Sequence, residues 1–443
     1  MFLCQTPSVF RSEEWKSRFH NVRLKKRRFG RQTHDLLPGP GPEISMKILF
    51  IQNRILFPTN TGGRIRTLNV LRYLSQWHDV TYLCNLEAGE EPHCDAMREI
   101  GVQLETVPWR SPALGEWKFY FGLALNMFSR LPFNVAKDNN PALRARAEQL
   151  ASQENYDLIV CDFCQMVPIA RGLPCRGRLL FQHNVEAQIF RRYIETASNW
   201  IRRLVMYLQW KKMVRFEKES GQYFDAVIAV SDQDREQFER DYGWKHVRMI
   251  DTAVDIDFFQ PSAEASPNQV AFVGSMDWLP NQEGVEWFVK QVWPIIRQAH
   301  LDAEFKIVGR NPSRQVEALT SEAGVKVLGT VPDVRPYLDQ ASVVVTPLLV
   351  GGGTRIKIFE AMAMEKAVVS TSIGAEGLKV DDQKHILLAD SVTDFANAVN
   401  RLLGSREERE QLGKTARELV CREFAAESVA RQFDAVCQKA LVR

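Results

Sequence analysis

The sequence predicts an α/β fold of two domains, each built on a doubly wound parallel sheet. At 443 residues the chain is too long for one compact core, so two domains are the natural expectation. Short segments rich in Val and Ile alternate with longer helical patterns, which is the order of βαβ units. One of these segments, residues 342–346, is apolar without alternation, as expected of a parallel strand covered on both faces.

Composition and charge exclude several classes of protein. Apolar residues make up 45% of the chain and charged residues 25%, as is usual for globular proteins. A net charge of +3 argues against a nucleic-acid-binding protein, whose basic face would show in the total. Eight cysteines in this length do not make a disulfide framework. Because no apolar run reaches about 18 residues and no signal-peptide pattern is present, we expect a cytoplasmic protein.

Residues 1–45 lack the periodicity of a folded segment. They contain a basic run at 23–31 and a Pro-Gly repeat at 38–42. An arm that binds nucleic acid or membrane is one interpretation. Because residue 46 opens a typical first strand, we expect residues 1–45 to be a disordered or dispensable extension.

The first domain is expected over residues 46–250. Its first strand, at 47–51, leads to a loop with Gly62 and Gly63 and then to a helix with a leucine stripe. In open parallel sheets ligands bind at the carboxyl ends of the strands, so this loop is a candidate site. Further strands are predicted at 80–83, 103–107, 158–160, 178–182 and 226–230.

Two segments of the first domain have an unusual composition. Residues 114–131 are aromatic and nearly free of charge at their centre, and residues 200–216 combine Trp and Leu with several Lys and Arg residues. They could be ordinary helices that pack on the sheet and extend their cations outward. They could instead form a surface that contacts an anionic bilayer.

Three short motifs resemble metal sites but favour structural roles. Asp232 and Asp234 form a DxD pattern after Ser231, where acidic residues suit a helix start. A second DxD pattern, at 255–257, falls in the expected interdomain linker, residues 251–268. The CxxC at 161–164 has no second pair at metal-ligand spacing and ends an apolar run. We therefore expect capping, turns and strand-end cysteines, and no metal.

The second domain, expected over residues 269–422, repeats the alternation of strands and helices. Its strands should end in glycine-containing loops at one edge of the sheet. Strands are predicted at 270–273, 305–308, 326–328, 342–346, 368–371 and 385–388, and helices at 285–296, 394–403 and 406–439.

A glycine loop and a helix start follow the strand at 342–346. Residues 351–353 are three glycines, which let the backbone approach a ligand closely. Thr354 can cap a helix whose first turn carries Arg355 and Lys357, and such a helix start binds phosphate oxygens. Glu360, on the same helix face as Lys357, suits the hydroxyls of a ribose. The alternative is a plain glycine turn with a surface Lys357–Glu360 pair.

Taken together, these features resemble the GT-B glycosyltransferases, in particular the retaining family 4 type. The similarity runs from Met46 to the C-terminus and is most specific at 46–66, 252–261 and 351–370. The block at 274–281, GSMDWLPN, is similar to bacterial transferases of exopolysaccharide and cell-envelope sugars. The resemblance implies two facing Rossmann-like domains, with the donor held by the C-terminal domain over residues 269–422. It also implies a last helix, over 423–443, that crosses back to the first domain.

Site residues follow from this resemblance position by position. It implies that Glu360 binds the donor ribose and that His183 lies near the transferred sugar. Loops at Arg310 and Val331 would flank the nucleobase. The implied catalytic residues are His183, Arg355 and Lys357. The implied donor-binding residues are Gly62, Gly63, Gly274, Ser275, Arg310, Val331, Gly352, Gly353, Thr354, Arg355, Ile356 and Glu360.

The chain departs from the family pattern at two points. Gly352 stands where the family has a first glutamate that contacts the donor sugar. Ser275 stands for the arginine after the first strand of the donor domain, and residues 281–283 offer no cation where the family has a lysine. Arg355 and Lys357 would then supply the positive charge from the other side of the pyrophosphate.

The implied activity is transfer of a glycosyl group from a nucleoside diphosphate sugar to a hydroxyl of a glycan or lipid-linked acceptor. Exopolysaccharide or cell-envelope synthesis would be its setting, on the inner face of the plasma membrane. No cofactor and no metal are expected, because cations and a helix start already face the leaving diphosphate. A nucleotide-sugar epimerase and a non-catalytic nucleotide-sugar-binding scaffold are alternatives on the same architecture.

Overall fold

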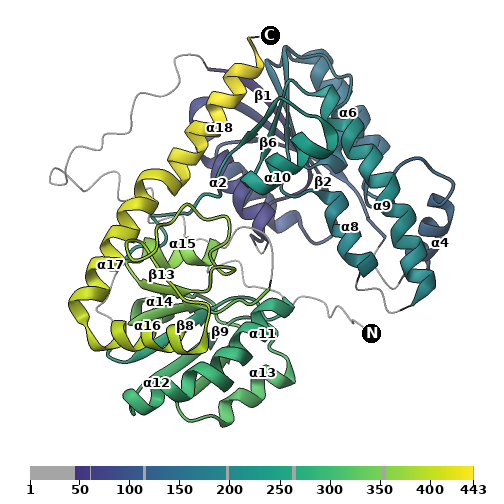
Figure 1. Cartoon of the computed structure of the whole chain (residues 1–443). Coiled ribbons are helices and arrows are strands. Elements are labelled where there is room, and N and C mark those ends of the chain that lie inside the picture. Colours follow the sequence, from purple (N-terminus) through teal and green to yellow (C-terminus); the bar gives the residue numbers. More distant parts are fainter. Residues whose placement is uncertain are drawn as a thin grey trace.

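The structure, a computed structural model, describes residues 45–59, 61–112, 116–195, 199–261, 266–350 and 356–442. Two α/β halves lie one above the other in Figure 1, the upper formed by the earlier part of the chain together with the C-terminal helix. Each half contains one sheet whose described strands are all parallel. The predicted α/β class with two parallel sheets is therefore confirmed.

The first sheet has seven strands in the order β3-β2-β1-β4-β5-β6-β7. Its strands are β1 (Lys47–Arg54), β2 (Asp79–Leu86), β3 (Gln103–Pro108), β4 (Leu158–Asp162), β5 (Gly177–Phe181), β6 (Ala226–Ala229) and β7 (Val247–Met249). β7, a three-residue edge strand, is the one described strand of this sheet that the sequence pattern did not predict, because three residues carry too little periodicity.

The main helices of this half are α2 (Gly62–Trp77), α4 (Trp117–Asn126), α6 (Pro141–Gln153), α8 (Glu186–Glu195), α9 (Trp200–Ser220) and α10 (Asp232–Gln237). Gly62 and Gly63 were expected in a loop, and they are instead the first residues of α2. Short helical turns complete the half, namely α3 (Cys94–Glu99), α5 (Phe133–Ala136) and α7 (Val167–Ala170).

The second sheet has six strands in the order β10-β9-β8-β11-β12-β13. Its strands are β8 (Gln269–Val273), β9 (Glu304–Val308), β10 (Val325–Gly329), β11 (Val343–Thr346), β12 (Ala367–Ser370) and β13 (Leu387–Leu388). Its helices are α11 (Leu279–Trp287), α12 (Trp293–Ala299), α13 (Arg314–Ala318), α14 (Arg335–Gln340), α15 (Ile356–Ala363), α16 (Val392–Gly404) and α17 (Arg406–Leu419). All four residues of β11 and of β12 are buried, as strands covered on both faces require.

The long helix predicted at 406–439 is two helices. α17 ends in a π-helical turn at Val420–Phe424, and α18 (Ala426–Ala440) begins after Ala425, which leaves the helical conformation. Ala425 forms a parallel bridge with Val254, in the segment that leads from the first half to the second. The apolar stripe continues on both sides of this break, so the periodicity alone could not reveal it.

α18 crosses back and packs on the first sheet, as the fold class implied (Figure 1). The ring of Phe433 is fully buried, with its centroid 5.2 Å from that of Phe181 in β5. Asp434 Oδ1 lies 2.8 Å from Nε2 of the buried His78, and Nδ1 of His78 accepts a hydrogen bond from the amide of Met46. The C-terminal helix α18 is thus part of the hydrophobic core of the first half.

α4 and the first half of α9 do not pack on the sheet. Trp117 and Phe121 of α4 are 70% and 58% exposed, and Trp200 at the start of α9 is 75% exposed. Only the second half of α9 is buried, around Met213 and Glu217. The interpretation of these segments as ordinary packed helices therefore holds for Phe119, Trp210 and Phe216, which pack, and not for the exposed rings of Trp117, Phe121 and Trp200. Among the described helices, none combines the length and the apolar character that crossing a bilayer requires.

Candidate active site

Each sheet reverses its strand order at one point, where open parallel sheets bind ligands. In the first sheet β1 pairs with both β2 and β4, and in the second β8 pairs with both β9 and β11. The first switch point is bordered by the start of α2 and by Asp162 at the end of β4. The second is bordered by Gly274 after β8 and by the segment that joins β11 to α15.

His183 lies just beyond β5 and is held by residues of two other elements. Its Nε2 is 2.6 Å from Oδ1 of Asp162, and Oδ2 of Asp162 accepts a 2.7 Å hydrogen bond from the hydroxyl of Thr67 in α2. Burial lowers the pKa of His183, and the adjacent Asp162 carboxylate opposes this. Because a carboxylate only accepts hydrogen bonds, a neutral His183 carries its proton on Nε2 and a lone pair on Nδ1.

Nδ1 of His183 is buried and has no hydrogen-bond partner among the described residues. It lies near the start of α2, because a Cβ added to Gly63 would stand 3.9 Å from it. The same Cβ would come within 2.8 Å of the ring of Phe163, which stacks on His183 with 4.1 Å between ring centroids. Glycine at 63 thus permits the close approach of helix and stacked rings. Nδ1 is therefore an oriented acceptor, buried at the first switch point, that no described residue uses.

In the second half, Lys357 extends from the first turn of α15 to the loop after β8. Its Nζ donates a 2.7 Å hydrogen bond to Oδ1 of Asn281 and lies 4.4 Å from the centroid of the Phe272 ring. Nδ2 of Asn281 donates to the carbonyl of Ser275 at 2.6 Å. A Cβ added to Gly274 would stand 3.0 Å from the ammonium nitrogen. The loop after β8 has no cation of its own, and the fold supplies one from α15.

A second cation reaches the same loop from the end of β9. Nε of Arg310 donates a 3.1 Å hydrogen bond to Oγ of Ser275 and lies 2.9 Å from Oδ2 of Asp277. Its side chain is 46% exposed, so it stays accessible to a ligand. Val331 follows the neighbouring strand β10 and is partly exposed. The structure thus brings together Gly274, Ser275, Arg310 and Lys357. Val331 follows a strand of the same sheet, and this position alone relates it to the other four.

Glu360 lies in α15, three residues and almost one helical turn beyond Lys357. Neither Lys357 nor Glu360 is exposed as the alternative of a surface pair would require. Burial raises the pKa of Glu360 to about 7, and the positive charge of Lys357 opposes the shift. Burial removes water from this carboxyl, so hydrogen bonds donated by ligand hydroxyls would stabilise its ionised form.

Part of the predicted site lies outside the described residues. It comprises Gly352, Gly353, Thr354 and Arg355, together with the first glycine of the loop. The described part of α15 runs from Ile356 to Ala363.

The two DxD motifs and the CxxC motif lie in structural surroundings, namely a helix cap, a turn and a buried strand end. Oγ of Ser231 accepts from the amide of Asp234 and so caps α10. Oδ1 of Asp255 accepts from the amide of Phe258 in a turn. Cys161 and Cys164 are fully buried at the end of β4. Within the described ranges, no three His, Cys, Asp or Glu side chains are grouped as metal ligands.

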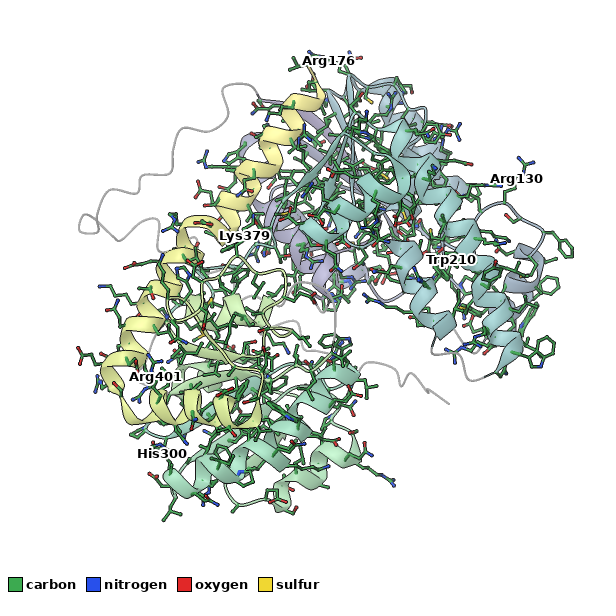
Figure 2. The ribbon with its side chains drawn as sticks, in the orientation of Figure 1. Arg130, Arg176, Trp210, His300, Lys379 and Arg401 are labelled. Carbon is green, nitrogen blue, oxygen red and sulfur yellow. The ribbon has the colours of Figure 1, made fainter. Side chains whose placement is uncertain are left out.

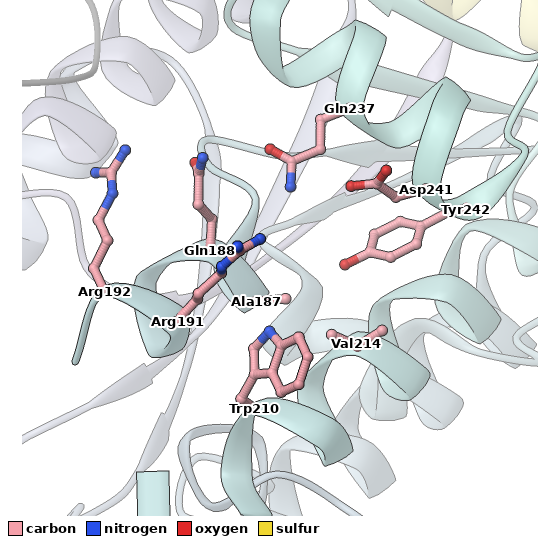
Figure 3. Close-up of a pocket in the computed structure, with 9 residues that line it drawn as sticks. All are labelled: Ala187, Gln188, Arg191, Arg192, Trp210, Val214, Gln237, Asp241 and Tyr242. Atoms are coloured by element: carbon pink, nitrogen blue, oxygen red, sulfur yellow. The ribbon is translucent and has the colours of Figure 1, made fainter. Parts of the chain in front are cut away.

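A cavity of about 410 Å³ lies in the first half between α8, α9 and the segment after α10 (Figure 3). Arg191 extends between Gln188 and the indole of Trp210, while Tyr242 and Asp241 border the opposite side. The remaining lining residues are Ala187, Arg192, Val214 and Gln237. Guanidinium, amide and carboxylate groups beside an indole are suited to a polyhydroxylated ligand.

Two family models match consecutive parts of the chain. Residues 61–258 match Glycosyltransferase Family 4, and residues 267–405 match Glycosyl transferases group 1. Together they cover more than half of the chain and meet where the first half gives way to the second. The chain belongs to the GT-B glycosyltransferases of the family 4 type.

Individual relatives agree with this assignment. The glycosyltransferase is 22% identical over 366 residues to a 44.6 kDa protein from the cps region of Klebsiella pneumoniae, covering 80% of this chain and 90% of the relative. It is 26% identical over 259 residues to an MMP α-(1→4)-mannosyltransferase of Mycolicibacterium hassiacum, covering 56% and 62%. The crystal structure of HepE from Anabaena, in complex with UDP, has the same fold, with a TM-score of 0.62, 16% identity and coverage of 89% and 100%.

Several residues of the candidate site were missed by sequence reasoning. Asp162 directly follows the apolar run of β4, a position at a strand's carboxyl end that could have marked it. Thr67, Asn281 and Phe163 carried no local signal, because each acts on a group far away in the sequence. Phe163 has a left-handed backbone conformation, with φ of 68°, which no sequence pattern predicted.

Proposed function

We propose that this glycosyltransferase moves a hexosyl group, with retention, from a nucleoside diphosphate sugar to a hydroxyl of a glycan or lipid-linked acceptor. The observation that carries the proposal is the placement of Lys357 over the loop after β8, one turn before the largely buried Glu360. A cation for the diphosphate and a carboxyl for the ribose then stand on one helix. UDP-glucose is the first donor to test, because a HepE structure is a complex with that compound.

In the proposed step, the bond between the anomeric carbon and the diphosphate oxygen breaks while the acceptor oxygen bonds to that carbon. The acceptor proton passes to the leaving diphosphate. Negative charge grows on this group in the transition state, and Lys357 and Arg310 stand beside the loop that would hold it. Fixed cations need no reorganisation during the reaction, so transfer should proceed without a metal. Nδ1 of His183 would accept from a sugar hydroxyl and so orient the donor.

The acceptor is proposed to bind to the first half, with the cavity beside Trp210 as its contact. Arg192 of this cavity interacts electrostatically with Asp234, as does Arg66, whose charge also acts on His183. The charges of Arg66 and Arg192 thus act on the same carboxylate, Asp234, between the cavity and the imidazole. The cps region that encodes one relative supports polysaccharide synthesis as the setting. Such acceptors are often lipid-linked, and we place the enzyme at the inner face of the plasma membrane.

A thermal-shift panel of nucleotide sugars tests the donor site first. A donor at a hundredfold excess over its Kd should stabilise the protein by about 2.7 kcal/mol. Lys357→Ala should then slow release of the nucleoside diphosphate in the presence of a lipid extract, and added chelator should not. Lys290→Ala is the matched control, since this lysine is 61% exposed on another helix of the same half. No stabilisation by any nucleotide sugar would contradict the proposal, and turnover that needs no acceptor would favour an epimerase.

A further inference from the structure

The described residues of α4 and of the first half of α9 expose many large apolar side chains. In α4, Trp117, Phe121 and Leu125 recur every four residues and are 57% to 70% exposed. The other side of α4 is the packed one, where the ring of Phe119 meets that of Phe133 with 5.0 Å between centroids. The exposed apolar surface, hereafter the aromatic surface, comprises Trp117, Tyr120, Phe121, Leu125, Phe128, Trp200, Ile201, Leu204 and Tyr207.

Direct contacts hold the two helices of the aromatic surface together. Nζ of Lys212 donates to the carbonyl of Asn126 at 2.5 Å and to that of Met127 at 3.3 Å. Nε2 of Gln209 donates to Oδ1 of Asn126 at 3.0 Å, and its Oε1 accepts from the amide of Phe133. The second half of α9 is anchored in the core by Met213. The exposed side chains are thus carried on a fixed support.

Positive charges predominate around the aromatic surface, and Glu116, which directly precedes α4, pairs with Arg110. Residues 117–130 and 200–216 contain no Asp or Glu. Lys118, Arg202, Arg203 and Lys211 are exposed on the same two helices. Arg130 projects from the edge of the molecule beside α4 (Figure 2). Lys and Arg are rarely buried in protein cores, so this mixture of aromatic rings and cations is not typical of a surface that another part of the protein covers.

We propose that the aromatic surface docks on an anionic lipid bilayer. Trp and Tyr favour the level of the lipid headgroups, Phe and Leu favour the acyl boundary beneath it, and Lys and Arg neutralise acidic headgroups. A second copy of the chain fits less well, because two such surfaces in contact would bring many cations together with few acidic partners. This inference names the membrane partner of the proposed function, and it depends on neither the donor nor the transfer step.

Co-sedimentation of the full chain with phosphatidylglycerol vesicles, without donor, tests the proposal. Binding should be strong at low salt and weak at high salt, and vesicles of phosphatidylcholine should bind poorly. The apolar variant, Trp117→Ser with Phe128→Ser, should lower binding at least about tenfold. The charge variant, Arg202→Glu with Arg203→Glu, should do the same. All proteins carry the basic run at 23–31, so any contribution from that run is common to every sample.

Matched controls separate the aromatic surface from general effects. Leu301→Ser changes an apolar side chain that is 78% exposed in the other half, and Lys245→Glu with Lys414→Glu reverses two exposed charges elsewhere. These controls should bind vesicles as the natural chain does. Stabilisation by UDP-glucose should stay unchanged in every variant, which distinguishes failure of docking from failure of the donor site. Absent vesicle binding, binding that ignores the apolar variant, or a dimer that this variant dissociates in sedimentation would overturn the proposal.

Discussion

The chemistry of His183 depends on three side chains from two other segments, the end of β4 and α2. Asp162 fixes the protonated nitrogen, Thr67 fixes Asp162, and Phe163 stacks on the ring. A histidine in the sequence could equally be a satisfied core residue. The unpartnered buried Nδ1 is what favours a ligand-binding role, because buried polar atoms normally have partners.

Asp162→Asn should disturb this arrangement while preserving its shape. The amide cannot accept from His183 and Thr67 through both of its atoms, so the imidazole loses its fixed tautomer. A hydrogen bond to a charged group is worth about 1.5–3 kcal/mol, and we therefore expect release of nucleoside diphosphate to slow about tenfold or more. Stopped assays at saturating donor measure kcat. A variant that melts earlier but keeps the natural kcat would assign Asp162 a structural role only.

Glu360 should make donor affinity depend on pH. Its carboxyl has a pKa raised to about 7 by burial, so it is largely protonated below this pH. The ionised form accepts ribose hydroxyls more strongly, so the affinity for UDP-glucose should rise as pH increases toward about 7 and level off above it. Titration calorimetry between pH 5.5 and about 8.5 measures this.

Glu360→Gln is the test of that assignment. The variant should bind the donor about tenfold more weakly above pH 7 and show a flat pH dependence. If the affinity of the variant for UDP-glucose still rose with pH as in the natural chain, a group other than Glu360 would be responsible for the pH dependence.

At the scale of elements, the break between α17 and α18 decides how the two halves connect. α17 packs in the second half, whereas α18 fills the first core with Val429 and Phe433. The last helix therefore belongs energetically to the domain that begins the chain.

Phe433→Ala should destabilise the protein by about 3–5 kcal/mol, because it removes a fully buried ring that touches Phe181. Val442→Ala, at a side chain that is 86% exposed, should leave the free energy of unfolding almost unchanged. Chemical denaturation followed by circular dichroism measures both. If the Phe433→Ala variant had the same free energy of unfolding as the Val442→Ala variant, α18 would contribute little to the first core.

For the whole molecule, the segment between the halves is tied to both of them. Arg66 donates to the hydroxyl of Thr252 at 2.8 Å, and Arg72 pairs with Asp255 at 2.6 Å. On the other side, Lys379 pairs with Asp251 at 2.8 Å. These contacts, with α18, join the two domains.

Removing residues 1–45 should leave the melting temperature and the release of nucleoside diphosphate essentially unchanged. The reason is that their sequence has no apolar periodicity with which to build a core. Thermal melting and turnover of the shortened chain, beside the full chain, measure this. A marked loss of either property would show that the segment packs on the enzyme or takes part in its reaction.

The sequence by itself determined the α/β class, the two parallel sheets and most strand positions. These depend on local patterns, since unbroken apolar runs predict covered strands and glycine loops mark their carboxyl ends. The spacing of Lys357 and Glu360 on one helix face was also readable, because three residues make almost one helical turn. The role proposed for this pair remains a prediction.

Only the tertiary structure decided which distant groups meet. The pairing of His183 with Asp162 and the approach of Lys357 to Asn281 each join segments that local periodicity treats separately. The resemblance implied that the last helix returns to the first domain, and the structure decided that Phe433 meets Phe181 of β5 there. It also decided that α4 leaves its aromatic face uncovered, since a helical pattern shows which residues share a face and not what covers that face. Such contacts form because burial and hydrogen bonding are satisfied across the whole fold rather than within one segment.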